Sequence, residues 1–179
     1  YDVYTNLVPD TDTKYPFETA SRLELDALKP LGDAYINDLK QAFTESWIDI
    51  YPNKNKRGGA YSSGSYDTMP YVLLNYQDKL DDVSTLAHEL GHSMHSFYTR
   101  KNQPYQYGDY PIFVAEVAST VNELLLAKHM LKVSTNKNER LAILNQLLEL
   151  FKGTIYRQVM FAEFEKYAYD LVEQDEVIT

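Results

Sequence analysis

The sequence predicts a mainly α-helical domain with a small β-sheet at the edge of a cleft. Most apolar residues recur at the 3.6-residue spacing of helices that bury one face. Glycine and proline, which interrupt helices, number only 7 each among 179 residues. Two short β-prone segments lie close together between positions 60 and 76. With 44% hydrophobic residues the chain can build one sizeable core, so we expect a single domain.

Composition excludes several classes of protein. The chain has no cysteine, which excludes disulfides and thiolate metal ligands. This fits a reducing compartment, and we expect a cytoplasmic location. A formal net charge of −9 argues against a nucleic-acid partner, which would favour a basic surface. No window approaches the ~18 consecutive apolar residues of a membrane span, so we expect no membrane partner.

The N-terminal part is expected to form two packing helices. Residues 1–16 contain two prolines and several Asp and Thr, and are predicted to be irregular or extended. A helix is predicted over 17–28, and it ends at Lys29-Pro30 because a proline disfavours the helical conformation of the residue before it. A second helix is predicted from about 31 to about 46, with its apolar residues on one side.

The small sheet is expected after a basic turn at 52–59 and before position 77. Strands are predicted at 60–63 and 71–76. A strand with an unpaired edge can hydrogen-bond an extended peptide, and Gly58 and Gly59 would permit close backbone approach. The competing interpretation of the basic turn is a solvated loop.

A helix is predicted from Ser84 to Tyr98, with Asp81 and Asp82 as candidate caps. Its apolar residues fall within one arc of the helical wheel, and its histidines cluster on the opposite side. Gly91 leaves room for a close neighbour. The apolar residues are Leu86, Leu90, Met94 and Phe97, and the histidines are His88, His92 and His95.

His88 and His92 are four residues apart, so on a helix both imidazoles can reach one zinc ion. Glu89 lies beside the pair, where it can accept a proton from an activated water. A catalytic zinc needs a third protein ligand and one open position. A chance occurrence of two such histidines is the competing interpretation, since short motifs carry that risk.

The third ligand is expected from a following helix, predicted from Pro111 to about Leu131. Glu116 near its start is the candidate. Glu123 shares that face about 10.5 Å further along, so it is expected either to support a ligand or to be a solvated surface residue. His95 lies as far from His88 and is expected to be a supporting or structural residue.

The C-terminal segments 139–151 and 153–172 are predicted to form a helical hairpin or one long helix. Each carries an apolar stripe that is expected to belong to the core. The first stripe consists of Leu141, Leu144, Leu147, Leu148 and Phe151, and the second of Tyr156, Met160, Phe164 and Tyr167.

Residues 88–96 (HELGHSMHS) and 113–119 (FVAEVAS) together resemble the thimet-oligopeptidase-like zinc metallopeptidases of the HExxH type. Within that family the chain is most similar to the oligoendopeptidases F. The similarity extends to residues 47–49 (WID), 56–62 (KRGGAYS), 71–76 (YVLLNY) and 161–165 (FAEFE), and covers nearly the whole chain.

The resemblance implies a helical, zincin-like catalytic core around a deep channel that a small sheet lines. It implies one Zn²⁺ per chain, with Glu89 as general base. The ligands that it implies are His88, His92 and Glu116. The residues that it implies for aligning the peptide are Gly59, Ala60 and Tyr61.

The resemblance also implies that residues 1–179 form a single catalytic-core fragment of a larger peptidase. On this expectation, the family's larger N-terminal helical part and a C-terminal stretch that helps to grip the substrate are absent from these residues. The expected partners are therefore a short peptide substrate and the remaining parts of the same polypeptide.

The expected activity is hydrolysis of internal bonds in short peptides. One alternative is a zinc carboxypeptidase, in which Arg57 or Lys56 would bind the terminal carboxylate of the substrate. Another is a non-catalytic, zinc-stabilised peptide-binding fragment. The presence of Glu89 argues against the latter, since structural zinc needs no base.

Overall fold

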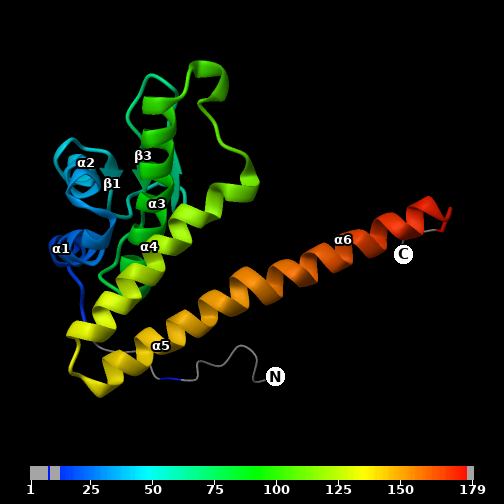
Figure 1. Ribbon diagram of the computed structural model, residues 1–179. Coiled ribbons are helices and arrows are strands. Elements are labelled where there is room, and N and C mark those ends of the chain that lie inside the picture. Colours follow the sequence, from blue (N-terminus) through cyan, green and yellow to red (C-terminus); the bar gives the residue numbers. More distant parts are fainter. Residues whose placement is uncertain (1–7, 9–12, 177–179) are drawn as a thin grey trace.

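The computed structural model describes residue 8 and residues 13–176, and it confirms a mainly α-helical fold with a small sheet (Figure 1). Most of the segment 1–16 lies outside the described residues. The helices are α1 (Phe17–Ala27), α2 (Asp33–Thr44), α3 (Leu80–Asn102), α4 (Ile112–Val133), α5 (Lys137–Phe151) and α6 (Arg157–Glu173).

Helices α1 and α2 lie on one side of α3, where they cover its apolar face (Figure 1). A short 3₁₀ turn, Lys29–Leu31, separates them at Pro30, as the proline predicted. Their inward-facing side chains, such as Ala20 and Leu39, are fully buried. Trp47, shortly after α2, packs against Phe97 of α3, with ring centroids 5.7 Å apart and ring planes tilted by 40°. These contacts bury the apolar face of α3, so the opposite face is the one left to face solvent.

The sheet has three strands in the order β1-β3-β2. Strand β2 (Tyr61–Ser63) pairs antiparallel with β3 (Tyr71–Leu73), within the two predicted segments. Strand β1 (Ile48–Asp49) pairs parallel with β3 and was not predicted, because two residues show no alternation. The second edge of β2 pairs with no strand among the described residues, and Ser62 lies against Ser93 of α3, with hydroxyl oxygens 2.8 Å apart.

Helix α3 starts at Leu80, four residues before the predicted start. Asp82 caps it from inside the first turn, because its carboxylate accepts the backbone N–H groups of Gln77 and Lys79, both at 2.9 Å. The predicted apolar face is confirmed, since Leu86, Leu90 and Met94 are at most 1% exposed.

Helix α4 crosses α3 at very close range (Figure 1). A Cβ atom at Gly91 would lie 2.5 Å from Ser119 Cα and 2.8 Å from the carbonyl oxygen of Ala118. Only a glycine therefore allows this approach of the two backbones. Pro111 is the cap of α4 rather than its first residue. The crossing brings the start of α4 over the histidine face of α3.

Helix α5, a π-helical turn (Lys152–Tyr156) and α6 follow one another as one long rod, not as a hairpin (Figure 1). The start of the rod is anchored to the core by Ile143, which is 1% exposed, and by the Tyr15 hydroxyl, which donates to Glu139 at 2.5 Å. Further along, the rod leaves the body of the molecule.

The expectation that both C-terminal stripes belong to the core is wrong for most of their members. Leu148 is 61% exposed and Phe164 is 69% exposed, and the other members except Leu147 are also exposed. The periodicity identified an apolar helix face correctly, but within residues 13–176 nothing covers it. None of the described helices combines the length and apolarity that a membrane crossing requires.

Candidate metal centre

Helices α3 and α4 bring together the three side chains expected to bind a metal ion. His88 Nε2 lies 3.1 Å from His92 Nε2. Glu116 Oε2 lies 3.4 Å from the former nitrogen and 3.5 Å from the latter. The three potential ligand atoms thus form a nearly equilateral triangle.

The dimensions of this triangle suit a tetrahedral zinc site. Zinc binds imidazole nitrogen and carboxylate oxygen at about 2.0–2.1 Å, so two ligands of a tetrahedral ion lie about 3.3–3.4 Å apart. The three measured separations bracket that value. Two imidazoles and one carboxylate are also a donor set that catalytic zinc uses, with the fourth position left open. The residues present therefore fit the ion.

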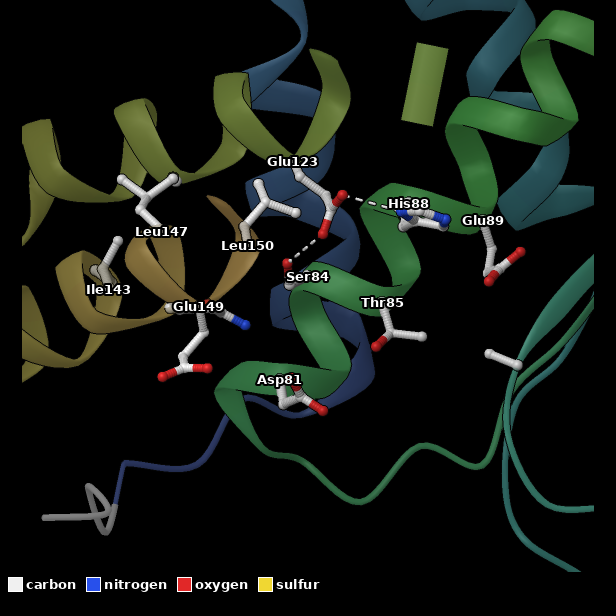
Figure 2. A pocket seen from close by; sticks show the side chains of 13 residues that line it. Asp81, Ser84, Thr85, His88, Glu89, Glu123, Ile143, Leu147, Glu149 and Leu150 are labelled. Atoms are coloured by element: carbon white, nitrogen blue, oxygen red, sulfur yellow. Dashed lines mark hydrogen bonds and ion pairs between the residues drawn. The ribbon is translucent and has the colours of Figure 1, made fainter. Parts of the chain in front are cut away.

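Glu123 contacts the far side of the His88 ring (Figure 2). Its Oε2 lies 2.9 Å from His88 Nδ1, and its Oε1 accepts a hydrogen bond from Ser84 Oγ at 3.2 Å. A carboxylate at this position accepts the Nδ1–H proton, which leaves the Nε2 lone pair directed at the triangle. This is the contact that a residue supporting a metal ligand makes.

The pKa values of the two histidines move in opposite directions. Burial by itself would lower the pKa of His88, but the hydrogen bond and the negative charge of Glu123 raise it above its ordinary value. Burial lowers the pKa of His92, and the neighbouring positive charge of His88 adds to that effect, although Glu116 opposes it. His92 is therefore the readier of the two to present a neutral nitrogen.

Glu116 is the most exposed of the three side chains, with 60% of its side chain accessible. Ser119, one turn later on α4, donates its hydroxyl to Glu116 Oε2 at 2.9 Å. Ser119 is itself fully buried at the crossing with Gly91. The contact that sets the distance between the helices therefore also orients the carboxylate.

Glu89 lies between α3 and the sheet, and it is only 7% exposed. Burial raises the pKa of its carboxyl group, and the charge of Glu116 acts in the same direction. The neighbouring His88 and a hydrogen bond with the Ser62 backbone partly offset this. A carboxylate with a raised pKa is a better proton acceptor than an ordinary one.

His95 does not join the triangle. Its ring stacks on Tyr110, with centroids 3.6 Å apart and planes 5° from parallel. The Tyr110 hydroxyl lies 3.1 Å from Ser96 Oγ. Tyr110 directly precedes the cap of α4. The stack therefore holds the segment that leads into α4 against α3.

The residues expected to align a peptide lie at the start of β2. Gly59 has a φ of +86°, and its carbonyl oxygen accepts the Asn75 side-chain amide at 2.8 Å. Tyr61 is 46% exposed. Lys56 is not available to bind a carboxylate, since its ammonium contacts the Asp49 carboxylate and the Tyr51 carbonyl oxygen, at 3.2 Å and 2.8 Å.

A cavity of about 460 Å³ opens beside Glu89 and His88 (Figure 2). Helices α3, α4 and α5 line it, together with Ala60 at the entry to β2. Sequence reasoning missed the α5 wall, because no local pattern tells which helices meet. It also missed Ser119, although a position three residues after Glu116 on the same helix face was a usable signal.

A model of peptidase family M3 matches residues 2–179. The chain is 50% identical over its whole length to oligopeptidase PepF of Bacillus subtilis, of which it covers 27%. It is 49% identical to the chromosomal oligoendopeptidase F of Lactococcus lactis subsp. cremoris, of which it covers 30%. The chain therefore spans less than a third of these curated relatives.

Solved structures show the same fold. A protein of Chlamydophila abortus that is described as a peptidase superposes on 98% of the chain, with a TM-score of 0.85 and 51% identity. The aligned part is 29% of that protein. Oligoendopeptidase F from Enterococcus faecium aligns over 87% of the chain, with a TM-score of 0.52 and 30% identity, and 20% of that protein is covered.

Proposed function

Because the chain belongs to peptidase family M3, we propose that it forms the zinc-binding core of a metalloendopeptidase that hydrolyses internal bonds of short peptides. The observation that carries the proposal is the triangle of two imidazole nitrogens and one carboxylate oxygen, with separations of 3.1–3.5 Å and with Glu89 beside it. The oligoendopeptidase names of the similar proteins support the choice of peptides as substrates.

His88, His92 and Glu116 would hold the ion. When bound, zinc supplies a Lewis acid that polarises the scissile carbonyl group and makes water nucleophilic near neutral pH. Glu123 holds the proton of His88 on Nδ1 and so keeps Nε2 free as a ligand. Ser119 orients Glu116 through a hydrogen bond.

Glu89 accepts the proton of the attacking water and passes it to the amine that leaves. Its burial supports this role, because a carboxylate shielded from solvent holds the proton more firmly than an exposed one. Structural zinc sites need no such base, so the buried Glu89 favours catalysis over a merely zinc-stabilised peptide-binding protein.

The peptide would lie along the edge of β2 that pairs with no described strand. Backbone hydrogen bonds to an edge strand bind an extended peptide without regard to its side chains. Strand β2 follows Gly59 and Ala60, and Ala60 shares the cavity wall with Glu89. A peptide on this edge therefore passes Glu89, and a free terminus is not required.

The decisive experiment replaces Glu89 by Gln in the intact natural protein. The variant should keep one zinc per chain, measured by atomic emission, and should lose peptide cleavage by about 10²–10⁴-fold. His92→Ala should lose zinc and cleavage together. Cleavage at the parent rate by Glu89→Gln would refute the assigned base.

Mapping the products separates an endopeptidase from the carboxypeptidase alternative. An endopeptidase cuts a peptide whose two ends are blocked, whereas a carboxypeptidase needs the free carboxylate. The engagement of Lys56 with Asp49 and Tyr51 removes one of the two cations considered for that carboxylate. We therefore expect blocked peptides to be cut internally.

A further inference from the structure

The cavity beside Glu89 extends along α3, away from the triangle formed by His88, His92 and Glu116, which we call the metal triangle. Thr85 lies one turn before Glu89, and Asp81 a further turn towards the start of the helix (Figure 2). Asp81 and His88 are seven residues apart, which corresponds to about 10.5 Å along the axis. The cavity thus begins beside Glu89 and extends along α3 over a length that can take a long side chain.

The wall opposite α3 is mostly apolar, with Gln146 as a polar member. Ile143, Leu147 and Leu150 of α5 face the cavity, and Glu149 lies at the end that is remote from His88 (Figure 2). Ile143 is buried in the core and Leu147 and Leu150 are half-buried, so this wall is held in place by the packing of α5. Its three apolar side chains offer a surface for methylene groups.

The charge at the remote end is negative. Asp81 is exposed and forms no ion pair with any residue among 13–176. Glu149 is partly neutralised by Lys152, whose Nζ lies 3.2 Å from Oε2. Asp81 is therefore the acid best placed to receive a cation from outside the chain.

We infer that this cavity is a specificity subsite that takes a lysine or arginine side chain from the residue next to the scissile bond. Both side chains lay an apolar stem along hydrophobic surface while their charged end stays in a polar environment. Here the stem would contact the α5 wall and the cation would meet Asp81. The inference rests on the proposed function, since it assumes a peptide bound at Glu89.

The test uses blocked peptides that differ at one position, which carries lysine, norleucine or glutamate. Binding is measured by calorimetry on the zinc-loaded Glu89→Gln form of the intact protein, in which no turnover interferes. The lysine peptide should bind about 2- to 5-fold more tightly than the norleucine peptide, as for a partly exposed ion pair. The glutamate peptide should bind most weakly.

The variant Asp81→Asn, in the same background, should abolish the advantage of lysine over norleucine and leave the norleucine peptide unchanged. Glu163→Gln on α6 removes an exposed acid far from the cavity and is the matched control. An undiminished lysine advantage in Asp81→Asn, or equal binding of all three peptides by the parent form, overturns the inference.

Cleavage by the parent protein distinguishes the two proposals. If the inference holds, the cuts fall at a fixed distance from lysine, and Leu147→Asp weakens binding of the norleucine peptide by removing apolar wall. Cuts scattered with respect to lysine contradict the subsite although a peptidase is present. Lysine-selective binding that depends on Asp81, without any cleavage, would support the subsite and contradict the catalytic proposal.

Discussion

Glu123 lies outside the triangle of candidate ligand atoms but contacts one of its members, His88. One carboxylate oxygen of Glu123 lies 2.9 Å from His88 Nδ1, and the other accepts a hydrogen bond from the Ser84 hydroxyl. A carboxylate held from two sides cannot easily turn away, so it favours the tautomer of His88 that carries the proton on Nδ1. From the sequence a solvated glutamate is an alternative interpretation, because spacing alone does not show what a side chain contacts.

We expect Glu123→Ala to weaken zinc binding by about 10- to 100-fold, because His88 loses the acceptor for its Nδ1 proton. Competition with a chelator of known affinity measures this. Glu163→Ala, which removes an exposed glutamate on α6, should leave the affinity unchanged. Equal zinc affinity in Glu123→Ala and the parent would show that the hydrogen bond does not orient the ligand.

Glu24 on α1 is a buried acid without a partner. Neither carboxyl oxygen contacts a hydrogen-bond donor among the described residues, and the side chain is fully buried. Burial, and to a lesser extent the charge of Glu123, raise the pKa of Glu24 to about 8. The group is thus protonated in the folded chain at a pH where it would be ionised in the unfolded chain.

This difference makes stability depend on pH. Between about 4.5 and 8 the folded state holds a proton on Glu24 that the unfolded state has released. Stability therefore falls as the pH rises through this range, by at most about 1.4 kcal/mol per pH unit. Below 4.5 both states are protonated and the contribution is constant.

Glu24→Gln should remove this part of the pH dependence and should stabilise the metal-free protein most at pH 8. Urea unfolding of parent and variant at several pH values, in the presence of a chelator, gives the difference that belongs to Glu24. The histidines titrate in both proteins, so their contribution cancels in that difference. A difference that does not change with pH would mean that Glu24 has an ordinary pKa.

At the scale of elements, the crossing of α3 and α4 converts a local motif into a cluster of three potential ligands. The two histidines share a face by helical spacing alone, but Glu116 reaches them only because the two backbones meet at Gly91 and Ser119. The spacing of the crossing therefore sets the size of the triangle.

Gly91→Ala should destabilise the protein by about 1–3 kcal/mol, since the added Cβ would meet the backbone of α4 at 2.5 Å. Zinc affinity should fall with it, because α4 must move away from the histidines. Gly153→Ala is the control, as a Cβ there meets nothing within 4 Å. That change should stabilise the rod by up to about 1 kcal/mol. Parent-like zinc affinity in Gly91→Ala would show that the triangle tolerates a wider crossing.

The sequence could predict the features that local rules determine. The apolar face of α3, the close neighbour at Gly91 and the two strands of the hairpin follow from periodicity and residue type. The two-residue strand β1 could not be predicted, because its pairing with β3 depends on tertiary contacts. The cavity wall from α5 could not be predicted either, since periodicity identifies an apolar face but not the surface that it meets.

On the scale of the whole molecule, the dominant feature is the contrast between the packed body, formed by α1 to α4 and the sheet, and the long rod of α5 and α6 (Figure 1). The body buries its apolar residues around α3, whereas α6 exposes aromatic side chains on several sides. Phe161, Phe164 and Tyr167 are among them, each more than half exposed. Exposed aromatic surface of this extent is uncommon on a free monomer and is expected to attract other apolar groups.

We therefore expect residues 1–179, produced alone, to increase the fluorescence of the apolar dye ANS in proportion to the exposed face of α6. Replacing Phe161 and Phe164 by Ser should reduce the signal without changing zinc binding, since both lie outside the metal triangle and the cavity. Replacing Glu163 and Glu165 by Ser on the same helix is the matched control and should not reduce it. If the phenylalanine variant kept the full signal while circular dichroism showed an intact helix, the dye would be bound elsewhere. The rod would then not be the main exposed apolar surface of the folded chain.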